Sequence, residues 1–155
     1  VGCGIGGNLS HMLRAPTLYG IDVHEPSLER AKINTQGKAR LYKASATALP
    51  FPQRSVELVL TCGLLMHAAE AALPRILKEL GRVSAKYVLL VEYIDTTRRA
   101  INEWHGYNGI LFADNFGLHF WRNNPHYQPL WRRPLASDQG FSGMSGVLFQ
   151  RREGM

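Results

Sequence analysis

The stretch VGCGIGGN at residues 1–8 decides how the rest of the chain is interpreted. Its glycines allow backbone conformations that other residues avoid, and they let the chain come close to a bound molecule. Asn8 can cap a short helix that contains Leu9, Met12 and Leu13. The stretch therefore predicts a glycine loop between the end of a strand and the start of a helix, a common binding place for phosphates and nucleosides.

Downstream of this loop, short apolar runs alternate with helical patterns. Strands are predicted at 17–22, 39–44, 56–61 and 86–92. One helix is predicted to begin at Glu25 and to end at Gly37, and a second helix is predicted at 70–83. This alternation is typical of βαβ units and predicts a mostly parallel sheet with helices on both faces.

After residue 93 the sequence becomes aromatic and is interrupted by glycines. A short helix is predicted near 114–122, and Phe112, Phe116 and Phe120 repeat every four residues, which favours a role in the core. Turn residues separate two final strands, at about 127–133 and 146–151, which we expect to pair as an antiparallel hairpin.

The glycine loop fits two kinds of cofactor site. Gly2-x-Gly4-x-x-Gly7 matches a dinucleotide fingerprint, whereas Gly2-x-Gly4-x-Gly6 matches a loop that holds S-adenosylmethionine. Asp22 follows about 20 residues later, at the end of a predicted strand, where a carboxylate can accept hydrogen bonds from ribose hydroxyls. Both cofactors contain adenosine, so these residues leave the choice open. A plain strand-to-helix turn, with Asp22 capping the next helix, is the structural alternative.

The segment LPFPQRSVELVLTCGLLMH, residues 49–67, resembles class I S-adenosylmethionine-dependent methyltransferases, and so does GIDVHEPSLERAK at 20–32. Val56-Glu57 replaces the Phe-Asp pair of the family pattern, and Ser45 stands where the family often has Asp. The resemblance implies a Rossmann-like α/β fold in one domain, residues 1–155. Residues of about 1–93 would form the cofactor-binding part, and about 94–155 would supply an acceptor-side insert and the last strands.

The resemblance also implies site residues. The cofactor would be lined by residues that follow the predicted strands: Gly2, Cys3, Gly4, Gly6, Asp22, Val23, Ser45, Ala46, Thr61 and Cys62. His67 is a candidate general base, Glu92 would face the acceptor, and His105 could contact a sugar ring. Structural roles for these histidines are the alternatives. The sulfonium methyl group is already activated, so no metal is expected, and the six histidines show no metal-ligand spacing.

A narrower resemblance extends over nearly the whole chain. VLTCGLLMH, YVLLVEY, WHGYNGILFADNFG and the final GVLFQRRE are similar to bacterial methylases associated with pseudaminic acid biosynthesis. This similarity implies a small-molecule acceptor, a sugar or glycan precursor of the nonulosonic acid type. With two isolated cysteines and no long apolar run, we expect a cytoplasmic protein without a membrane span.

The chain begins at Val1 in the middle of the motif, so we expect an N-terminal truncation within the first strand. In the family an acid precedes the glycine loop, and the first strand lies between the second and the fourth. Without that strand we expect weak cofactor binding and two unpaired strand edges.

Three other functions remain open from the sequence. The formal charge of +6, from 18 Lys and Arg against 12 Asp and Glu, suggests a nucleic-acid methyltransferase. Residues 61–64 read TCGL, however, and lack the NPPY or DPPY tetrapeptide used on base amines, which disfavours nucleic acid. The second open function is a nicotinamide dehydrogenase, and the third is a truncated, inactive methyltransferase-like domain. The oligomeric state is not indicated.

Overall fold

The computed structural model describes residues 1–101, 111–136 and 143–153. The chain divides into two compact units, Val1–Pro50 and Phe51–Met155. The boundary at Pro50 differs from the subdivision near residue 93 that the sequence suggests, and the expectation of one domain stays a prediction. No described helix is long and apolar enough to cross a membrane.

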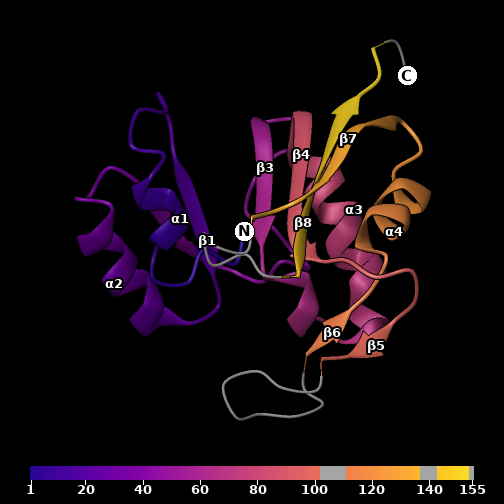
Figure 1. Ribbon diagram of the computed structural model, residues 1–155. Coiled ribbons are helices and arrows are strands. Elements are labelled where there is room, and N and C mark those ends of the chain that lie inside the picture. Colours follow the sequence, from indigo (N-terminus) through magenta and orange to yellow (C-terminus); the bar gives the residue numbers. More distant parts are fainter. Residues whose placement is uncertain (102–110, 137–142, 154–155) are drawn as a thin grey trace. The chain divides into compact units, whose positions relative to one another are not determined.

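The first unit is a βαβ arrangement preceded by the glycine loop. Its elements are α1 (Gly7–Ser10), β1 (Tyr19–Asp22), α2 (Glu25–Asn34) and β2 (Arg40–Lys43). The two strands are parallel, with Ile21 opposite Tyr42, as the alternation predicts (Figure 1). Pro26 lies in the first turn of α2, where its missing N–H is not needed.

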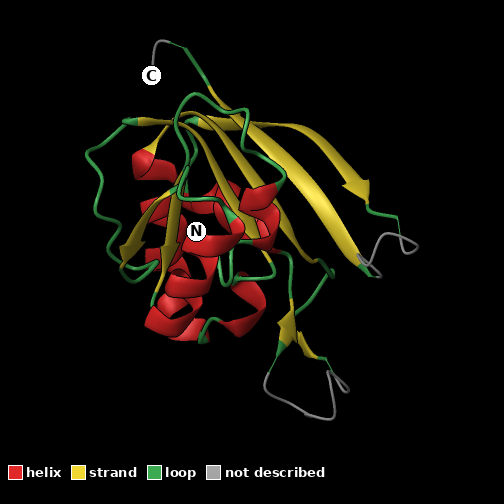
Figure 2. Cartoon of the chain, turned by 90° about the vertical axis from the view of Figure 1, so that its left-hand side faces the viewer, coloured by secondary structure: helices red, strands yellow, loops and turns green. Residues whose placement is uncertain are grey.

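The second unit contains a four-stranded sheet. Its elements are β3 (Val56–Cys62), the 3-10 turns η1 (Leu65–His67) and η2 (Glu70–Ala72), α3 (Leu73–Val83), β4 (Ser84–Tyr93), β5 (Arg99–Ala100), β6 (Phe112–Ala113), α4 (Phe116–Asn123), β7 (Tyr127–Pro134) and β8 (Met144–Arg151). The strand order is β3-β4-β8-β7, and β5 and β6 form a separate short ribbon (Figure 2).

The strand directions correct one expectation. β1 and β2 are parallel, and so are β3 and β4, but β8 runs antiparallel to both β4 and β7, and β5 and β6 are also antiparallel. The described strands thus form three sheets, not one mostly parallel sheet, with β1 and β3 each at an edge. The expected C-terminal antiparallel pair is confirmed, with Leu148 opposite Trp131.

Two amphipathic helices cover one face of the four-stranded sheet, where α3 and α4 lie side by side (Figure 1). α4 buries Phe116 and Phe120 completely, which confirms their predicted place in the core. The Phe120 ring packs on Phe149 of β8 at 4.7 Å between centroids and on Tyr127 of β7 at 5.2 Å. Phe112 is only half-buried. This packing fixes the start of α4, where the polar residues described below are found.

Candidate functional site

The glycine loop has the left-handed backbone that its sequence predicts. Gly2, Gly4 and Gly6 have φ angles of +65°, +50° and +81°. A Cβ atom on Gly4 would meet nothing within 4 Å, so this side of the loop is open to a ligand. A Cβ on Gly6 would lie 3.0 Å from the Cβ of Ala31, so this glycine allows the loop to pack against α2. The loop therefore combines an open glycine with a packing glycine.

Asp22 holds the loop in place from the end of β1. Its Oδ2 accepts a hydrogen bond from the backbone N–H of Gly4 at 2.8 Å, and its Oδ1 accepts one from His24 at 2.9 Å. The carboxylate is half-buried, and each of its oxygens has a second lone pair for another donor. Asp22 can therefore accept ribose hydroxyls while it supports the glycine loop.

The remaining predicted cofactor residues of this unit lie near the ends of the two strands. Cys3 donates its backbone N–H to the carbonyl of Ile21 at 2.9 Å, beside β1, and burial raises the pKa of its thiol. Val23 follows Asp22 and is 64% exposed. Ser45 and Ala46 follow β2, and the Ser45 hydroxyl accepts a hydrogen bond from the backbone N–H of Thr47 at 3.2 Å. Contact of these residues with a cofactor stays a prediction.

In the second unit, Thr61 and Cys62 end β3, as predicted, and lead into η1. Thr61 is buried and Cys62 is half-buried. Gly63 follows with a φ of +65°, and its N–H donates to the carbonyl of Val91 on β4 at 2.9 Å. The positive φ turns the chain sharply at the end of the strand, so the backbone can enter η1 directly.

Glu92 acts as a clamp on this turn. Its side chain is fully buried at the end of β4 and accepts hydrogen bonds from the backbone N–H groups of Leu64, at 3.2 Å, and Leu65, at 3.1 Å. Burial raises the pKa of Glu92 to about 7, although hydrogen bonds from the backbone N–H groups at the start of η1 act in the opposite direction. The sequence suggests an acceptor-facing acid here, whereas the geometry is that of a positioning residue.

The two predicted histidine bases differ in what can be described. His67 ends η1 and is exposed, and partial burial lowers the pKa of its imidazole. At neutral pH the ring is therefore uncharged and able to accept a proton. His105 lies outside the described residues. A catalytic role for either histidine stays a prediction.

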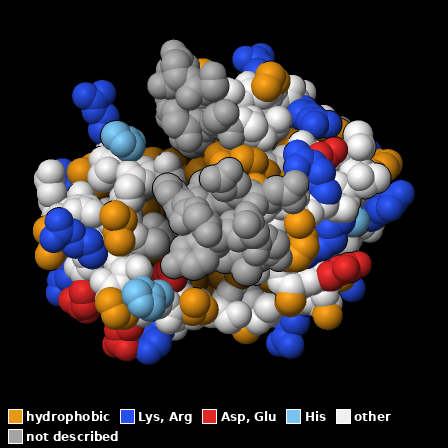
Figure 3. Space-filling view, turned by 60° about the horizontal axis from the view of Figure 1, so that its bottom comes forward, with side chains coloured by type: hydrophobic (Ala, Val, Ile, Leu, Met, Phe, Trp, Pro, Cys, Tyr) orange, Lys and Arg blue, Asp and Glu red, His pale blue; other side chains and the backbone are white. Residues whose placement is uncertain are grey.

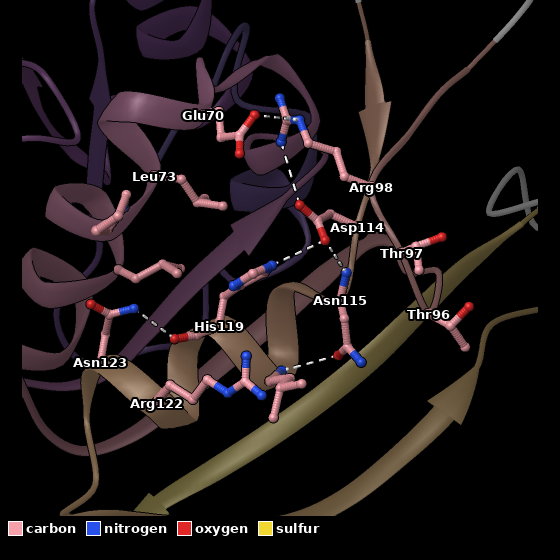
Figure 4. Close-up of a pocket in the computed structure, with 13 residues that line it drawn as sticks. Glu70, Leu73, Thr96, Thr97, Arg98, Asp114, Asn115, His119, Arg122 and Asn123 are labelled. Atoms are coloured by element: carbon pink, nitrogen blue, oxygen red, sulfur yellow. Dashed lines mark hydrogen bonds and ion pairs between the residues drawn. The ribbon is translucent and has the colours of Figure 1, made fainter.

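A cavity of about 510 Å³ lies between α3 and α4, and no pattern in the sequence predicts it. Figure 4 shows Arg98 and His119 reaching toward Asp114 from different elements. The Asp114 Oδ1 lies 3.0 Å from His119 Nε2, and its Oδ2 lies 3.5 Å from Arg98 Nη1. Only the spacing of Asp114 and His119 around the predicted helix start could have signalled this pairing.

The methyltransferase domain family matches residues 1–86 of the chain. No curated protein matches it in sequence. Its structure is similar to that of an S-adenosylmethionine-dependent methyltransferase from Methanosarcina mazei, with a TM-score of 0.74, 18% identity, and coverage of 97% of this chain and 90% of that chain.

Two further solved structures are similar. For a methyltransferase from Aquifex aeolicus, the TM-score is 0.69, the identity is 19%, and the match covers 97% of this chain and 79% of that one. The 1,6-didemethyltoxoflavin-N1-methyltransferase of Burkholderia thailandensis was solved with bound S-adenosylhomocysteine. For this structure the TM-score is 0.76 and the identity is 14%, and the match covers 99% of this chain and 69% of that one. At these identities the likeness shows the fold. The family match spans more than half of the chain, and this chain therefore belongs to the methyltransferase domain family, enzymes that take S-adenosylmethionine as methyl donor.

Proposed function

We propose that this methyltransferase acts on a small sugar or glycan precursor, of the acidic nonulosonic type represented by pseudaminic acid. The resemblance of residues 59–67, 87–93, 104–117 and 146–153 to methylases of that pathway supports the acceptor class. The observation that supports methyl transfer is the hydrogen bond from the backbone N–H of Gly4 to Asp22, on a loop where the space beside Gly4 is open.

S-adenosylmethionine fits the residues that the first unit presents. Its ribose hydroxyls would meet the free lone pairs of Asp22, and Gly4 would allow close approach of the amino-acid portion. Ser45 and Ala46 would lie on the adenine side, and contact of Thr61 and Cys62 with the cofactor stays a prediction. When bound, the cofactor supplies a methyl group activated by the adjacent sulfonium. The protein then has to orient the acceptor and remove its proton where necessary.

His67 is the candidate for removing that proton. It is exposed, and its lowered pKa keeps the imidazole neutral at pH 7. Glu92 supports it indirectly, because the carboxylate binds the two amides that begin the turn on which His67 lies. We assign Glu92 a positioning role and leave His105 as a candidate for contact with the acceptor.

The distribution of charge favours a small acceptor over a nucleic acid. On the coloured part of the face in Figure 3, Lys and Arg side chains are scattered among acidic and apolar ones and form no continuous basic strip. Nucleic-acid binding proteins usually gather their basic residues on one face. The sequence has only two cysteines, at widely separated positions, and we propose a cytoplasmic location.

Labelled methyl transfer tests the proposed function. The protein is incubated with methyl-tritiated S-adenosylmethionine and, separately, with a nonulosonic acid, a neutral amino sugar and transfer RNA. We expect label on the acidic sugar alone, and clearly less label with Asp22→Asn when S-adenosylmethionine is below saturation. Equal labelling of the neutral sugar, or labelling of transfer RNA, would overturn the acceptor assignment. Label on none of the three, with S-adenosylhomocysteine also unable to bind, would overturn the methyl-transfer role.

A further inference from the structure

We propose that the cavity between α3 and α4 is a second binding site, which takes a small hydroxylated anion through Arg122 and His119. Its ligand is a sugar-sized molecule bearing a carboxylate or a phosphate. We distinguish this ligand from the methyl acceptor, because neither His67 nor Glu92 is among the residues that line the cavity.

The shape and lining of the cavity suit such a molecule. Its volume of about 510 Å³ is within the range of roughly 300–1,000 Å³ found for small-molecule sites. Leu73 and Leu77 of α3 and Leu118 of α4 supply apolar surface, and polar side chains converge on it from α4 and from the segment before β5 (Figure 4). A sugar ring presents the same combination of apolar faces and polar edges.

Asp114 organises the polar side of the cavity. Its side chain is only 7% exposed, and its charge is balanced by Arg98, whose guanidinium also donates to the carbonyl of Ala68 at 3.2 Å. The Arg98 guanidinium lies over the ring of Phe112, 4.1 Å from its centroid. Because Arg98 occupies the space beside the carboxylate, Asp114 is not available as a ligand for a cation. Among the described residues no group of acidic, histidine or cysteine side chains is arranged to hold a metal.

The contact with Asp114 also determines the chemistry of His119. A carboxylate only accepts hydrogen bonds, so His119 Nε2, 3.0 Å from Asp114 Oδ1, carries the proton. In the neutral ring Nδ1 is then an acceptor, suited to a hydroxyl group. The His119 side chain is 37% exposed and lines the cavity, so a ligand can reach it.

Arg122 supplies the positive charge for the anion. It lies in the last turn of α4, is exposed, and lines the same cavity as His119. Within the described part of the chain it forms no ion pair, unlike Arg98. A guanidinium presents paired donors that match a carboxylate or a phosphate. Arg122 and His119 together therefore recognise an anionic group and a hydroxyl group on one molecule.

Isothermal titration of the whole protein with three probes tests the site. The probes are glucuronate, glucose 6-phosphate and the neutral methyl glucoside. We expect the two charged sugars to bind and the neutral one to bind at least about tenfold more weakly. The tighter of the two charged probes identifies carboxylate or phosphate as the preferred group. The same titrations follow Arg122→Gln and, as a matched control, Arg132→Gln, an exposed arginine on β7.

Arg122→Gln should weaken the charged probes by about tenfold or more, and Arg132→Gln should leave them unchanged. Because Arg122 is exposed, the variant should retain the wild-type melting temperature, and His119→Gln provides an independent second variant that should weaken all hydroxylated probes. Binding of neither charged probe, or equal binding by wild type and Arg122→Gln, would overturn the site. S-adenosylhomocysteine is titrated into each variant, so that loss of the anion site is distinguished from failure of the methyl-donor site.

Discussion

The buried carboxylate of Glu92 accepts a hydrogen bond from the backbone N–H of Leu65 at 3.1 Å, although 27 residues separate the two. A second bond, from Leu64 at 3.2 Å, completes the clamp. The end of β4 thereby determines where η1 begins, and with it the position of His67. An acid that is hidden from solvent can in this way influence the exposed end of a neighbouring strand.

Glu92 should make the stability of the protein depend on pH. Its pKa is about 7 in the folded state against an ordinary value of 4.5. Between these values the folded state holds the proton and the unfolded state does not, so the unfolding free energy should fall as pH rises through the window. A shift of this size corresponds to roughly 3 kcal/mol. Urea denaturation at several pH values between 5 and 8 measures the slope.

Glu92→Gln should remove this slope. The amide keeps one acceptor and loses the other, so the variant should be less stable than wild type at pH 5, by about 1–3 kcal/mol. The gap should close toward pH 8, where wild type has lost its proton. Glu57→Gln is the matched control, because Glu57 is exposed on β3. An equal gap at pH 5 and pH 8 would contradict a proton on Glu92.

Asp22→Asn should weaken the binding of S-adenosylhomocysteine. The asparagine has one acceptor oxygen in place of two, and its NH₂ group faces a backbone N–H of either Gly4 or His24. The loop would then lose a support, and the ribose would lose a charged acceptor. We expect at least about a tenfold loss of affinity by calorimetry. Glu25→Gln, an exposed acid of the same unit paired with Lys43, should bind as wild type does. Unchanged affinity in Asp22→Asn would remove Asp22 from the site.

The sequence predicts well those helices and strands whose buried apolar residues follow a regular pattern within one short segment. α3 shows its apolar stripe in the sequence, and β4 is a continuous apolar run, so both were expected within a few residues of their bounds. The sequence does not predict β5 and β6, because each strand has only two residues and so shows no periodicity.

The candidate site was predictable to a different extent in each unit. Asp22 and the glycines form a motif with fixed spacing, and the structure brings them together. The clamp by Glu92 and the pairing of Asp114 with Arg98 depend on contacts between distant segments. No spacing in a single sequence encodes such contacts, because the packing of the sheet and helices creates them.

His67 should titrate below the ordinary histidine value. Partial burial disfavours the charged imidazole, which lowers the pKa of His67 from 6.5. The ring protons can be followed by NMR from pH 5 to 8, with the His67→Gln spectrum to assign the signal. If His67 is the general base, His67→Gln should reduce kcat by roughly 10²- to 10⁴-fold and leave the affinity for S-adenosylhomocysteine unchanged. His11→Gln, at an exposed histidine of the first unit, should retain full kcat. A midpoint at or above 6.5 would contradict the burial of the ring, and an unchanged kcat would show that His67 is not the base.

Gly81→Ala should destabilise the protein, although alanine normally favours a helix by about 1 kcal/mol over glycine. A Cβ atom on Gly81 of α3 would lie 2.0 Å from the Oδ1 atom of Asn124. Asn124 is buried and donates from Nδ2 to the carbonyls of Leu77, at 3.0 Å, and Phe120, at 3.1 Å. The new methyl group would displace it and break these bonds, so we expect a loss of about 2–4 kcal/mol in urea denaturation.

A double-mutant cycle separates this clash from other effects of alanine at position 81. In the Asn124→Ala background the space beside Gly81 is empty, so Gly81→Ala should become neutral or slightly stabilising there. Gly7→Ala is the control in the other unit, because Gly7 begins α1 and a Cβ there meets nothing within 4 Å. The same loss of stability in both backgrounds would show that Asn124 is not what excludes a side chain at position 81. The presence of glycine at position 81 of α3 would then need another explanation.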